Sequence, residues 1–522
     1  MNAEMTKTLV ITEVSSKQAY IFSSNKLREN IRRSEEIAYV TGNRAPVELA
    51  GAYYSEPENF VYSGGGHAVY QFDSGDAATA FVRTFTLAVK EKYPEIELFA
   101  ACWDKDWYEE HPEYQIKNGA GKAKTFAELT PGEILGELSR KLERKKSFRA
   151  AAFHRVSFGI EDLGPDYRPI SKSMPVSAGD TGFGIDKYSF IRDNNIFSKA
   201  DDSNFIAVVT IDGNAMGKRV AEIYDSNTGS WDGCIETLRR FSEGTDRIFR
   251  ETFCQMCDGL VSKYGDTAFS GNEILLRPVI LAGDDVCFIT KGNFGLFCAE
   301  SFLKLLSEKD IPCAENIKFS ACAGVAVVHS KFPFHKAYDI SEELLGNAKR
   351  FGSSISIGGE ISAMDWHIEY GQLKDSVSEI REDYLTEDGI ITGIPTHLEL
   401  RPVAVTAPNK FNEAVRKATL GFRTPDFIFA LADSLRNEGT IPRSKLKGLR
   451  GALKQGETES RFYLKNRKIE KAVGDAVAAA HGTGNAPAGV FADIAGEKRS
   501  LIFDALELSE EKVFAGRGQN ND

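Results

Sequence analysis

Apolar runs and stretches of helical periodicity follow one another in the same order twice along the first four hundred residues. In the first copy an apolar strand precedes a helix start, a strand–glycine turn–strand unit, an amphipathic helix and a last strand. These elements are predicted at 8–14, 25–31, 60–73, 78–89 (with Ala78, Phe81, Val82, Phe85 and Val89 on one face) and 97–103. The order is β-α-β-β-α-β, which is the ferredoxin-like plan.

The second copy repeats this order with longer helices. The pattern predicts a strand, two helices, a hairpin, a helix with an aromatic inner face and a final strand. The first strand is expected at 205–211, the two helices at 214–224 and 232–263, the hairpin at 276–290 and the final strand at 319–328. The helix between the hairpin and the final strand is expected to have Phe294, Phe297, Phe302 and Leu305 facing inward. The chain is therefore predicted to be an α+β protein with two ferredoxin-like palm domains in tandem.

The remaining segments have different patterns. Residues 163–203 are rich in Gly, Pro, Ser and Asp and predict an irregular connector, and the chain after about 405 predicts helices followed by a disordered end. The helices are expected at 409–420, 425–437, 443–455 and 457–480, with a flexible loop at 481–489. The predicted domains are a first palm with a helical appendage at 1–162, the connector at 163–203, a second palm at 204–400 and a helical domain at 401–522.

Composition excludes some functions and restricts others. The 522 residues carry a formal net charge of −11, so contact with nucleic acid would need a local basic patch rather than a global positive field. No signal-peptide pattern and no membrane-length apolar run is found, and the cysteines are scattered, which favours a cytoplasmic protein. The only close cysteine pair, Cys254 and Cys257, lies within a predicted helix and favours helix packing over a metal site.

The chemistry of the chain is concentrated in three acidic residues. Asp284 and Asp285 lie at the tip of the second-copy hairpin, and Asp212 ends a strand about 70 residues upstream. Two hard divalent cations need several carboxylate oxygens within a few ångströms, with space left for phosphate oxygens. We predict that these acids and the backbone carbonyl of Ile211 hold Mg²⁺ (or Mn²⁺) for nucleotidyl transfer on ATP. The alternative, a solvated β-turn, is disfavoured by the matching strand that carries Asp212.

Neighbouring residues are candidates for contacting the nucleotide. Gly213 and Gly283 leave room for substrate because they lack Cβ. Lys218 and Lys349 are candidate triphosphate ligands, as is Arg219, although each could equally lie on a solvated helix face. Asn214 could bond a base or ribose, or could cap the helix that follows; the sequence leaves both open.

The first palm lacks the acidic hairpin. Its turn is Ser63 followed by Gly64, Gly65, Gly66 and His67, and only Glu13 lies near the end of its first strand. One carboxylate cannot hold two cations, so this palm is not expected to catalyse alone. Its glycine turn can accept a second nucleotide through backbone groups, and His67 is interpreted as a site-lining residue rather than a metal ligand.

These motifs resemble a known family. They are residues 21–29 (Ile-Phe-Ser-Ser-Asn-Lys-Leu-Arg-Glu), 63–66, 209–217 (Val-Thr-Ile-Asp-Gly-Asn-Ala-Met-Gly), 281–285 (Leu-Ala-Gly-Asp-Asp) and 348–349. Their order resembles the large polymerase/cyclase subunit of type III CRISPR effector complexes, in particular the Cmr-type branch. The resemblance implies that the second palm converts ATP into cyclic oligoadenylate when the complex binds target RNA, and that the first palm holds a partner nucleotide. It also implies a cytoplasmic antiviral complex with guide-RNA-bearing subunits.

The chain departs from that family in three ways. No histidine-aspartate nuclease domain precedes the first palm, so DNA cleavage is not expected. The cysteine zinc cluster usual between the palms is absent, since residues 104–233 contain no cysteine. Where the family usually has Gly-Gly-Asp-Asp, this chain has Ala-Gly-Asp-Asp, beginning at Ala282. The extra methyl group leaves both carboxylates intact, so it puts the reaction rate and the choice of acceptor in question rather than the activity itself.

A basic cluster in the C-terminal helices is a candidate surface for RNA or for the guide-bearing subunits, or else an ordinary charged helix face. Its members are Arg443, Lys445, Lys447, Arg450, Lys454, Arg461, Lys465, Arg467, Lys468 and Lys471. Two further readings stay open, namely a stand-alone palm synthase that makes a cyclic di- or oligonucleotide without guide RNA, and a catalytically weak scaffold.

Overall fold

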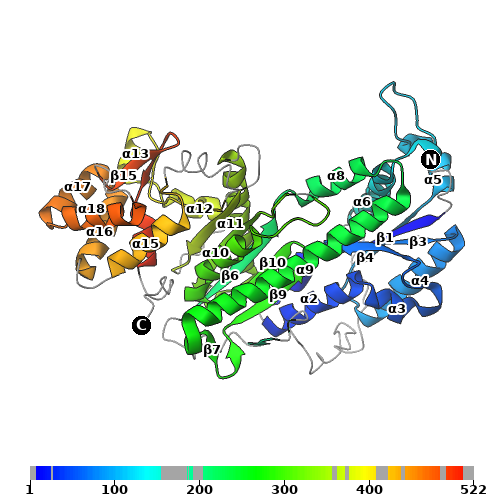
Figure 1. Ribbon diagram of the computed structural model, residues 1–522, viewed down its shortest axis with the longest axis horizontal. Helices are drawn as coiled ribbons and strands as arrows, with labels where there is room; N and C mark the ends of the chain where they lie inside the picture. The colour runs from blue at the N-terminus through cyan, green and yellow to red at the C-terminus, as the bar shows by residue number, and fades with distance from the viewer. Residues whose placement is uncertain are drawn as a thin grey trace.

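The structure is a computed structural model. It describes residues 7–24, 27–153, 185, 187–191, 204–314, 316–355, 361–370, 376–406, 421–436, 441–482 and 489–509. The first palm lies at one end of an elongated molecule and the C-terminal helices lie at the other, with the second palm between them (Figure 1). The long helix α9 (Trp231–Tyr264) runs diagonally from the second palm to the first.

The first palm has the predicted topology. Its four strands form an antiparallel sheet in the order β2-β3-β1-β4, the ferredoxin-like arrangement. The strands are β1 (Thr8–Val14), β2 (Phe60–Gly64), β3 (His67–Phe72) and β4 (Leu98–Trp103). The helices are α1 (Lys17–Ile21), α2 (Leu27–Thr41), α3 (Arg44–Ala50), α4 (Gly75–Lys92), α5 (Lys105–Glu110) and α6 (Pro131–Phe153). On α4, Ala78, Phe81, Phe85 and Val89 are buried as predicted, and Val82 is half-buried.

The second palm repeats that arrangement and extends it. Its sheet has the order β14-β12-β11-β6-β10-β9, in which the last four strands again have ferredoxin-like connectivity. The strands are β6 (Phe205–Gly213), β9 (Leu276–Ala282), β10 (Asp285–Lys291), β11 (Ala321–His329), β12 (Ser362–Ile368) and β14 (Val403–Thr406). The helices are α8 (Met216–Ser226), α9, α10 (Gly295–Leu306) and α11 (Phe334–Ile355). Two tandem palms in an α+β chain are confirmed.

Two glycines show that α10 and α11 cover opposite faces of this sheet. A Cβ on Gly295 of α10 would lie 2.3 Å from Ala207 Cβ, whereas a Cβ on Gly324 of β11 would lie 1.9 Å from the Ser341 carbonyl oxygen of α11. Successive side chains of a strand point to opposite faces. Gly324 is paired with Thr210, two residues from Asp212, so Asp212 projects toward the α11 side.

The C-terminal part is helical, as predicted, but it also contains strands. The helices are α12 (Val377–Glu382), α13 (Glu387–Thr392), α15 (Pro425–Arg436), α16 (Arg443–Gln455), α17 (Glu457–Asn466), α18 (Glu470–His481) and α19 (Phe503–Leu508). A small sheet joins β13 (Thr396–His397), β16 (Glu497–Ser500) and β15 (Phe491–Ile494). The prediction of one helix over 457–480 was wrong, because the chain breaks at Lys468, whose φ is 55°.

Several predictions fall on other parts of the chain. The expected helix at 409–420 and the expected disordered end lie outside the described residues, as does most of the connector; its strand β5 (Ser189–Phe190) pairs with β8 (Glu273–Ile274). β14 carries the second sheet past residue 400, and the domain boundaries stay predictions. No helix in the described parts is both long and apolar enough to cross a membrane. All eight cysteines are free thiols.

The palms meet through apolar contacts. Helix α2 packs against β9, and Phe22 stacks on Tyr338 of α11 with ring centroids 3.9 Å apart. Burial of this aromatic surface holds the first palm against the second.

Candidate active site

The strand register brings two of the predicted acids together. Asp285, the first residue of β10, is the direct Cα partner of Asp212 on β6. Directly opposed residues of an antiparallel pair project to the same face, with Cβ atoms about 5 Å apart. Asp284 lies next to them, because a Cβ built on Gly213 would meet Asp284 Cβ at 3.0 Å. The three acids are therefore neighbours, and Gly213 is the residue that lets Asp284 pack there.

The turn between β9 and β10 is held by α9. Gly283 has a φ of 65°, which glycine adopts without strain, and its N–H donates to Asp246 Oδ1 at 3.0 Å. Arg250 donates to the Leu281 carbonyl at 2.9 Å and pairs with Asp246 at 2.7 Å. Neither Asp246 nor Arg250 could be identified from the sequence, since an i,i+4 charged pair that holds a turn has the same pattern as a solvated pair.

Burial makes these acids hard to ionise. It raises the pKa of Asp285 to about 7, with Glu342 and then Asp284 adding like-charge repulsion and Lys17 of the first palm opposing it. Burial also raises the pKa of Asp284 and that of Glu342 on α11. Glu342 is a further carboxyl of this site that the sequence did not reveal. Helical periodicity indicates which face of α11 is apolar, but not which of its turns lies over the acidic hairpin.

This arrangement predicts a pH dependence for the metal-free protein. A carboxyl whose folded pKa is raised stabilises the fold below its unfolded value of about 4, and that contribution is lost as pH rises through about 7. The melting temperature should therefore fall between pH 5.5 and pH 8, by an amount equivalent to about 1–2 kcal/mol once solvent access to Asp285 is allowed for.

Thermal melts across that pH range measure the effect. Mg²⁺ should reverse it, and more strongly at pH 8 than at pH 6, since a cation binds the ionised acid. Asp285→Asn is the control and should flatten the pH profile. An equally steep profile in that variant would remove Asp285 as its source.

Lys349 lies against the first acid. Its ammonium is ion-paired and hydrogen-bonded with Asp212 Oδ2, and burial lowers its pKa. In the described parts of the chain, no three His, Cys, Asp or Glu side chains already converge as a metal cluster. The donor chemistry nevertheless fits a hard divalent cation: the candidate donors are carboxylate oxygens, and two of these carboxyls are held above their usual pKa by burial. A cation here would compete with Lys349 for Asp212.

Of the other residues predicted to contact the nucleotide, Asn214 lines a cavity beside Lys349, whereas Lys218 and Arg219 lie on α8. Asn214 donates to Ser320 Oγ at 3.1 Å and to the Ile361 carbonyl at 3.2 Å, so it ties β6 to neighbouring loops instead of capping α8, whose cap is Ala215. It still lines, with Lys349, a cavity of about 390 Å³. Lys218 is exposed on the first turn of α8, and Arg219 is paired with Glu222 at 2.8 Å.

The glycine turn of the first palm lies close to the acidic hairpin. Gly65 and Gly66 have φ values of 58° and 78°, and Lys17 bonds the Gly65 carbonyl. A cavity of about 410 Å³ lies between the palms, lined by Gly65, Gly66 and Lys17 on one side and by Ala282 and Asp285 on the other. Gly64 is outside this cavity lining and approaches α9 instead, with its ideal Cβ 3.2 Å from Ser242 Oγ.

Two other candidate residues of the first palm, Glu13 and His67, have polar partners. Glu13 accepts from Lys146 at 2.6 Å, and burial lowers the pKa of His67, whose Nε2 lies 3.3 Å from the Tyr62 hydroxyl. The glycine turn of the first palm and the acidic hairpin of the second thus face the same cavity from opposite palms.

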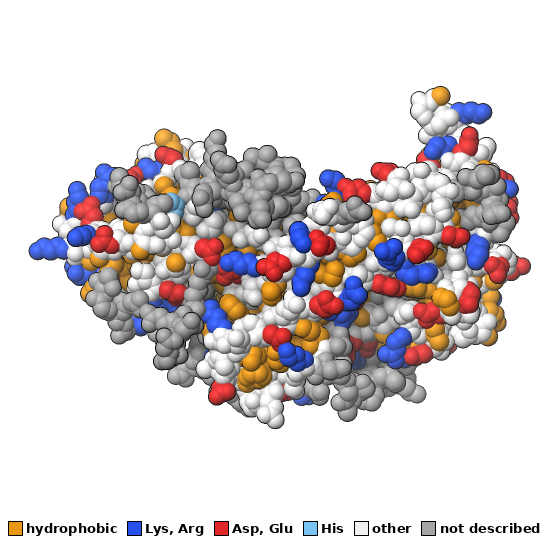
Figure 2. Space-filling view, in the orientation of Figure 1, with side chains coloured by type: hydrophobic (Ala, Val, Ile, Leu, Met, Phe, Trp, Pro, Cys, Tyr) orange, Lys and Arg blue, Asp and Glu red, His pale blue; other side chains and the backbone are white. Residues whose placement is uncertain are grey.

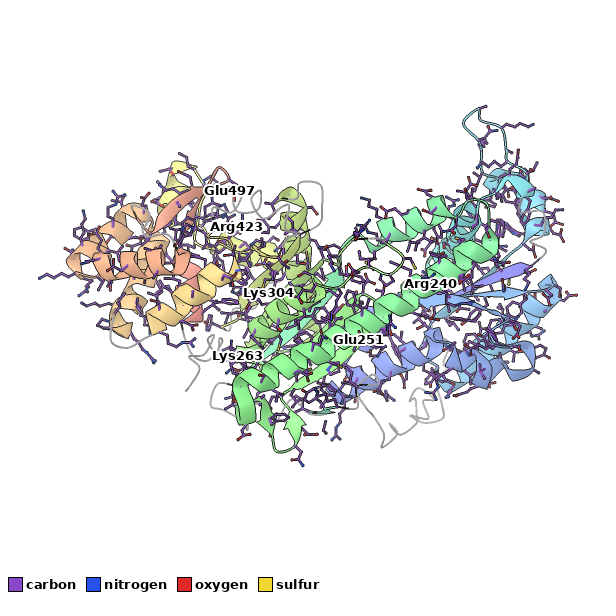
Figure 3. The ribbon with its side chains drawn as sticks, viewed as in Figure 1. Arg240, Glu251, Lys263, Lys304, Arg423 and Glu497 are labelled. Carbon is purple, nitrogen blue, oxygen red and sulfur yellow. The ribbon has the colours of Figure 1, made fainter. Side chains whose placement is uncertain are left out.

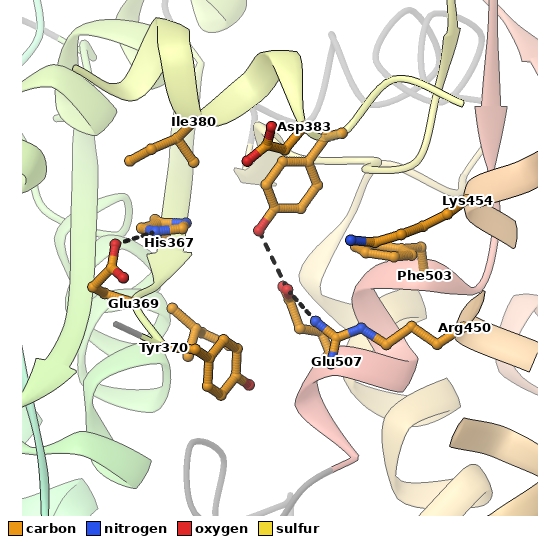
Figure 4. Close-up of a pocket in the computed structure, with 11 residues that line it drawn as sticks. His367, Glu369, Tyr370, Ile380, Asp383, Arg450, Lys454, Phe503 and Glu507 are labelled. Atoms are coloured by element: carbon orange, nitrogen blue, oxygen red, sulfur yellow. Dashed lines mark hydrogen bonds and ion pairs between the residues drawn. The ribbon is translucent and has the colours of Figure 1, made fainter. Parts of the chain in front are cut away.

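A separate cavity of about 240 Å³ lies between β12 and the C-terminal helices (Figure 4). His367 and Glu369 line one side, and Arg450, Lys454 and Glu507 line the other. Glu507 accepts from Arg450 at 3.1 Å and from the fully buried Arg401 at 2.6 Å. Since none of the acidic-hairpin residues line it, we interpret this region as the junction that joins the C-terminal helices to the second palm.

The second palm combines a ferredoxin-like sheet with an acidic hairpin whose carboxyls adjoin Asp212. Residues 205–354 match the family described as Cas10/Cmr2, second palm domain. No curated protein matches the chain.

Solved structures that the chain is similar to include complexes of the Csm1-Csm4 cassette. One contains cA4 (16% identity, 66% of this chain and 53% of that chain covered, TM-score 0.43), and another contains AMPPNP (15% identity, 66% and 53%, TM-score 0.42). A third contains pppApApA (13% identity, 97% and 69%, TM-score 0.46). The present chain spans about half the length of the first two.

Proposed function

We propose that this chain is the large, Cas10-type subunit of a type III CRISPR complex and that it joins ATP into cyclic oligoadenylate. The observation that carries the proposal is the pairing of Asp212 with Asp285 beside Asp284, within a sheet whose sequence matches a Cas10/Cmr2 palm. The likeness of motifs extends to the glycine turn of the first palm. The Cmr-type branch stays a prediction.

Each residue has a role in this proposal. Asp212, Asp284, Asp285 and the Ile211 carbonyl would hold Mg²⁺ or Mn²⁺, which when bound lowers the pKa of an acceptor 3′-hydroxyl and neutralises phosphate charge. Lys349 offsets negative charge on the triphosphate of the ATP that is attacked. Gly65 and Gly66 of the glycine turn hold the second nucleotide, whose 3′-hydroxyl attacks the α-phosphate as pyrophosphate leaves.

Replacing Lys349 by methionine tests its role. Lys349→Met should raise the KM for ATP about tenfold or more, because the triphosphate loses a partly buried cation while the stem of the side chain is kept. Steady-state rates over an ATP titration measure this. Lys105→Met, on an exposed face of α5 away from the site, is the matched control, and an equal rise of KM in both variants would contradict a specific role for Lys349.

The subunit role is tested by purification. The chain, expressed with its native operon partners, should co-purify with guide RNA and small helical subunits, and should form cyclic adenylates only when target RNA is added. The basic cluster of α16–α18 is the surface proposed for such contacts, and its end of the molecule carries lysines and arginines with acidic side chains among them (Figure 2). Arg450 is one member that is already engaged inside the protein, by its ion pair with Glu507 at 3.1 Å. Product from the chain alone would favour a stand-alone synthase, and Mg²⁺-dependent ATP binding without product would favour a scaffold.

A further inference from the structure

One stripe of helix α9 contacts both turns of the proposed site. Arg239 and Ser242 reach the first palm, and Asp246 and Arg250 hold the acidic hairpin of the second. At 100° per residue these positions fall within an arc of about 80°, so they lie along one face of the helix. From the first to the last they span about 16 Å.

The contacts to the first palm are directed at its backbone. Arg239 donates to the Phe60 carbonyl at 2.6 Å and to the Val61 carbonyl at 3.1 Å, and Ser242 donates to the Ser63 carbonyl at 2.5 Å. These carbonyls belong to β2, which leads directly into the glycine turn. The polar contacts therefore fix the strand end that positions the turn.

The C-terminal half of α9 is firmly part of the second palm. Phe249, Phe253 and Met256 are fully buried, and Phe253 packs against Phe288 of β10 with ring centroids 5.6 Å apart. Arg240 and Glu251, by contrast, lie off the contacting stripe and are exposed (Figure 3). A helix anchored in this way does not shift without moving the acidic hairpin.

We infer that α9 sets the separation between the two nucleotide-holding turns, and that Arg239, Ser242, Asp246 and Arg250 are positioning residues for nucleotide joining. This inference rests on the proposed function. The apolar contacts of α2 and Phe22 keep the palms together, whereas the α9 contacts fix where the glycine turn stands relative to Asp284 and Asp285. Joining two nucleotides requires that separation, and binding one nucleotide at the acids does not.

The test is calorimetric titration of the purified full chain with Mg²⁺ and AMPPNP, alongside the rate of ATP joining with its partners and target RNA. Wild type should bind two equivalents. Arg239→Gln with Ser242→Ala should keep the first equivalent, weaken the second about tenfold and slow joining about 10- to 100-fold. Arg239→Lys in the same Ser242→Ala background can remake one of the two Arg239 bonds and should recover part of the loss.

A control variant and the set of possible outcomes distinguish failure of the inference about α9 from failure of the proposed function. Arg240→Gln, one residue away and off the stripe, should leave both equivalents and the rate unchanged. If wild type binds two nucleotides and joins them, and the double variant does so equally well, the inference about α9 is overturned while the proposed function stands. If wild type binds no nucleotide, or joins none, the proposed function itself fails, and the inference fails with it.

Discussion

Removing both hairpin acids, Asp284→Ala with Asp285→Ala, should lower nucleotide joining by about 10³-fold or more while the protein stays folded. The reason is that Asp212 alone cannot hold the two cations on which such a transfer depends. Folding should not suffer, because burial raises the pKa of both acids and their ionisation opposes the folded state near neutral pH. The joining rate and a thermal melt measure the two effects.

A matched control accompanies this variant. Glu109 and Glu110 form an exposed acidic pair on α5, and replacing both by alanine should change neither rate nor melting temperature. Wild-type turnover by the Asp284/Asp285 double variant would contradict the assignment of the acidic hairpin, and a large loss of stability would mean that its acids are structural.

Arg401→Met should cost about 3–5 kcal/mol of folding free energy. Arg401 is fully buried between Asp504, at 3.3 Å, and Glu507, at 2.6 Å, and it joins the segment before β14 to α19. Methionine keeps much of the volume but leaves two buried carboxylates short of a counter-charge. Chemical denaturation at pH 7 measures the loss.

A double variant tests whether the unpaired charges cause this loss. Arg401→Met combined with Glu507→Gln should be less destabilised than the single variant, because one of the stranded charges is removed together with its partner. Mg²⁺-dependent nucleotide binding per folded molecule should be unchanged in both. A loss below about 1 kcal/mol in the single variant would show that the junction tolerates the unpaired acids.

The palm sheets were predictable because their strands are strongly apolar and separated by distinct turns. Asp212 and Asp285 could be expected to meet, since a strand end and a hairpin tip in this topology occupy adjacent strands. Glu342, Asp246 and Arg250 could not, because helical periodicity tells which face is apolar but not which turn of the helix lies over the hairpin. The break at Lys468 was hidden in a stretch of good helix formers.

The ion pair between Lys349 and Asp212 could not be predicted from the sequence either. The sequence offered Lys349 as a triphosphate ligand and Asp212 as a metal ligand, but not their contact with each other. Several acids share this partly buried site, and a nearby lysine stabilises the ionised form of one of them when no metal is bound. The C-terminal hairpin of β15 and β16 was missed because its strands are short and partly polar.

The most direct test of the central claim is to incubate the chain and its co-purifying partners with Mg²⁺, target RNA and α-labelled ATP, and to resolve the products by mass. We expect adenylates linked 3′ to 5′, with one pyrophosphate released for each bond formed. ADP and phosphate as the only products, or no product with all components present, would contradict it.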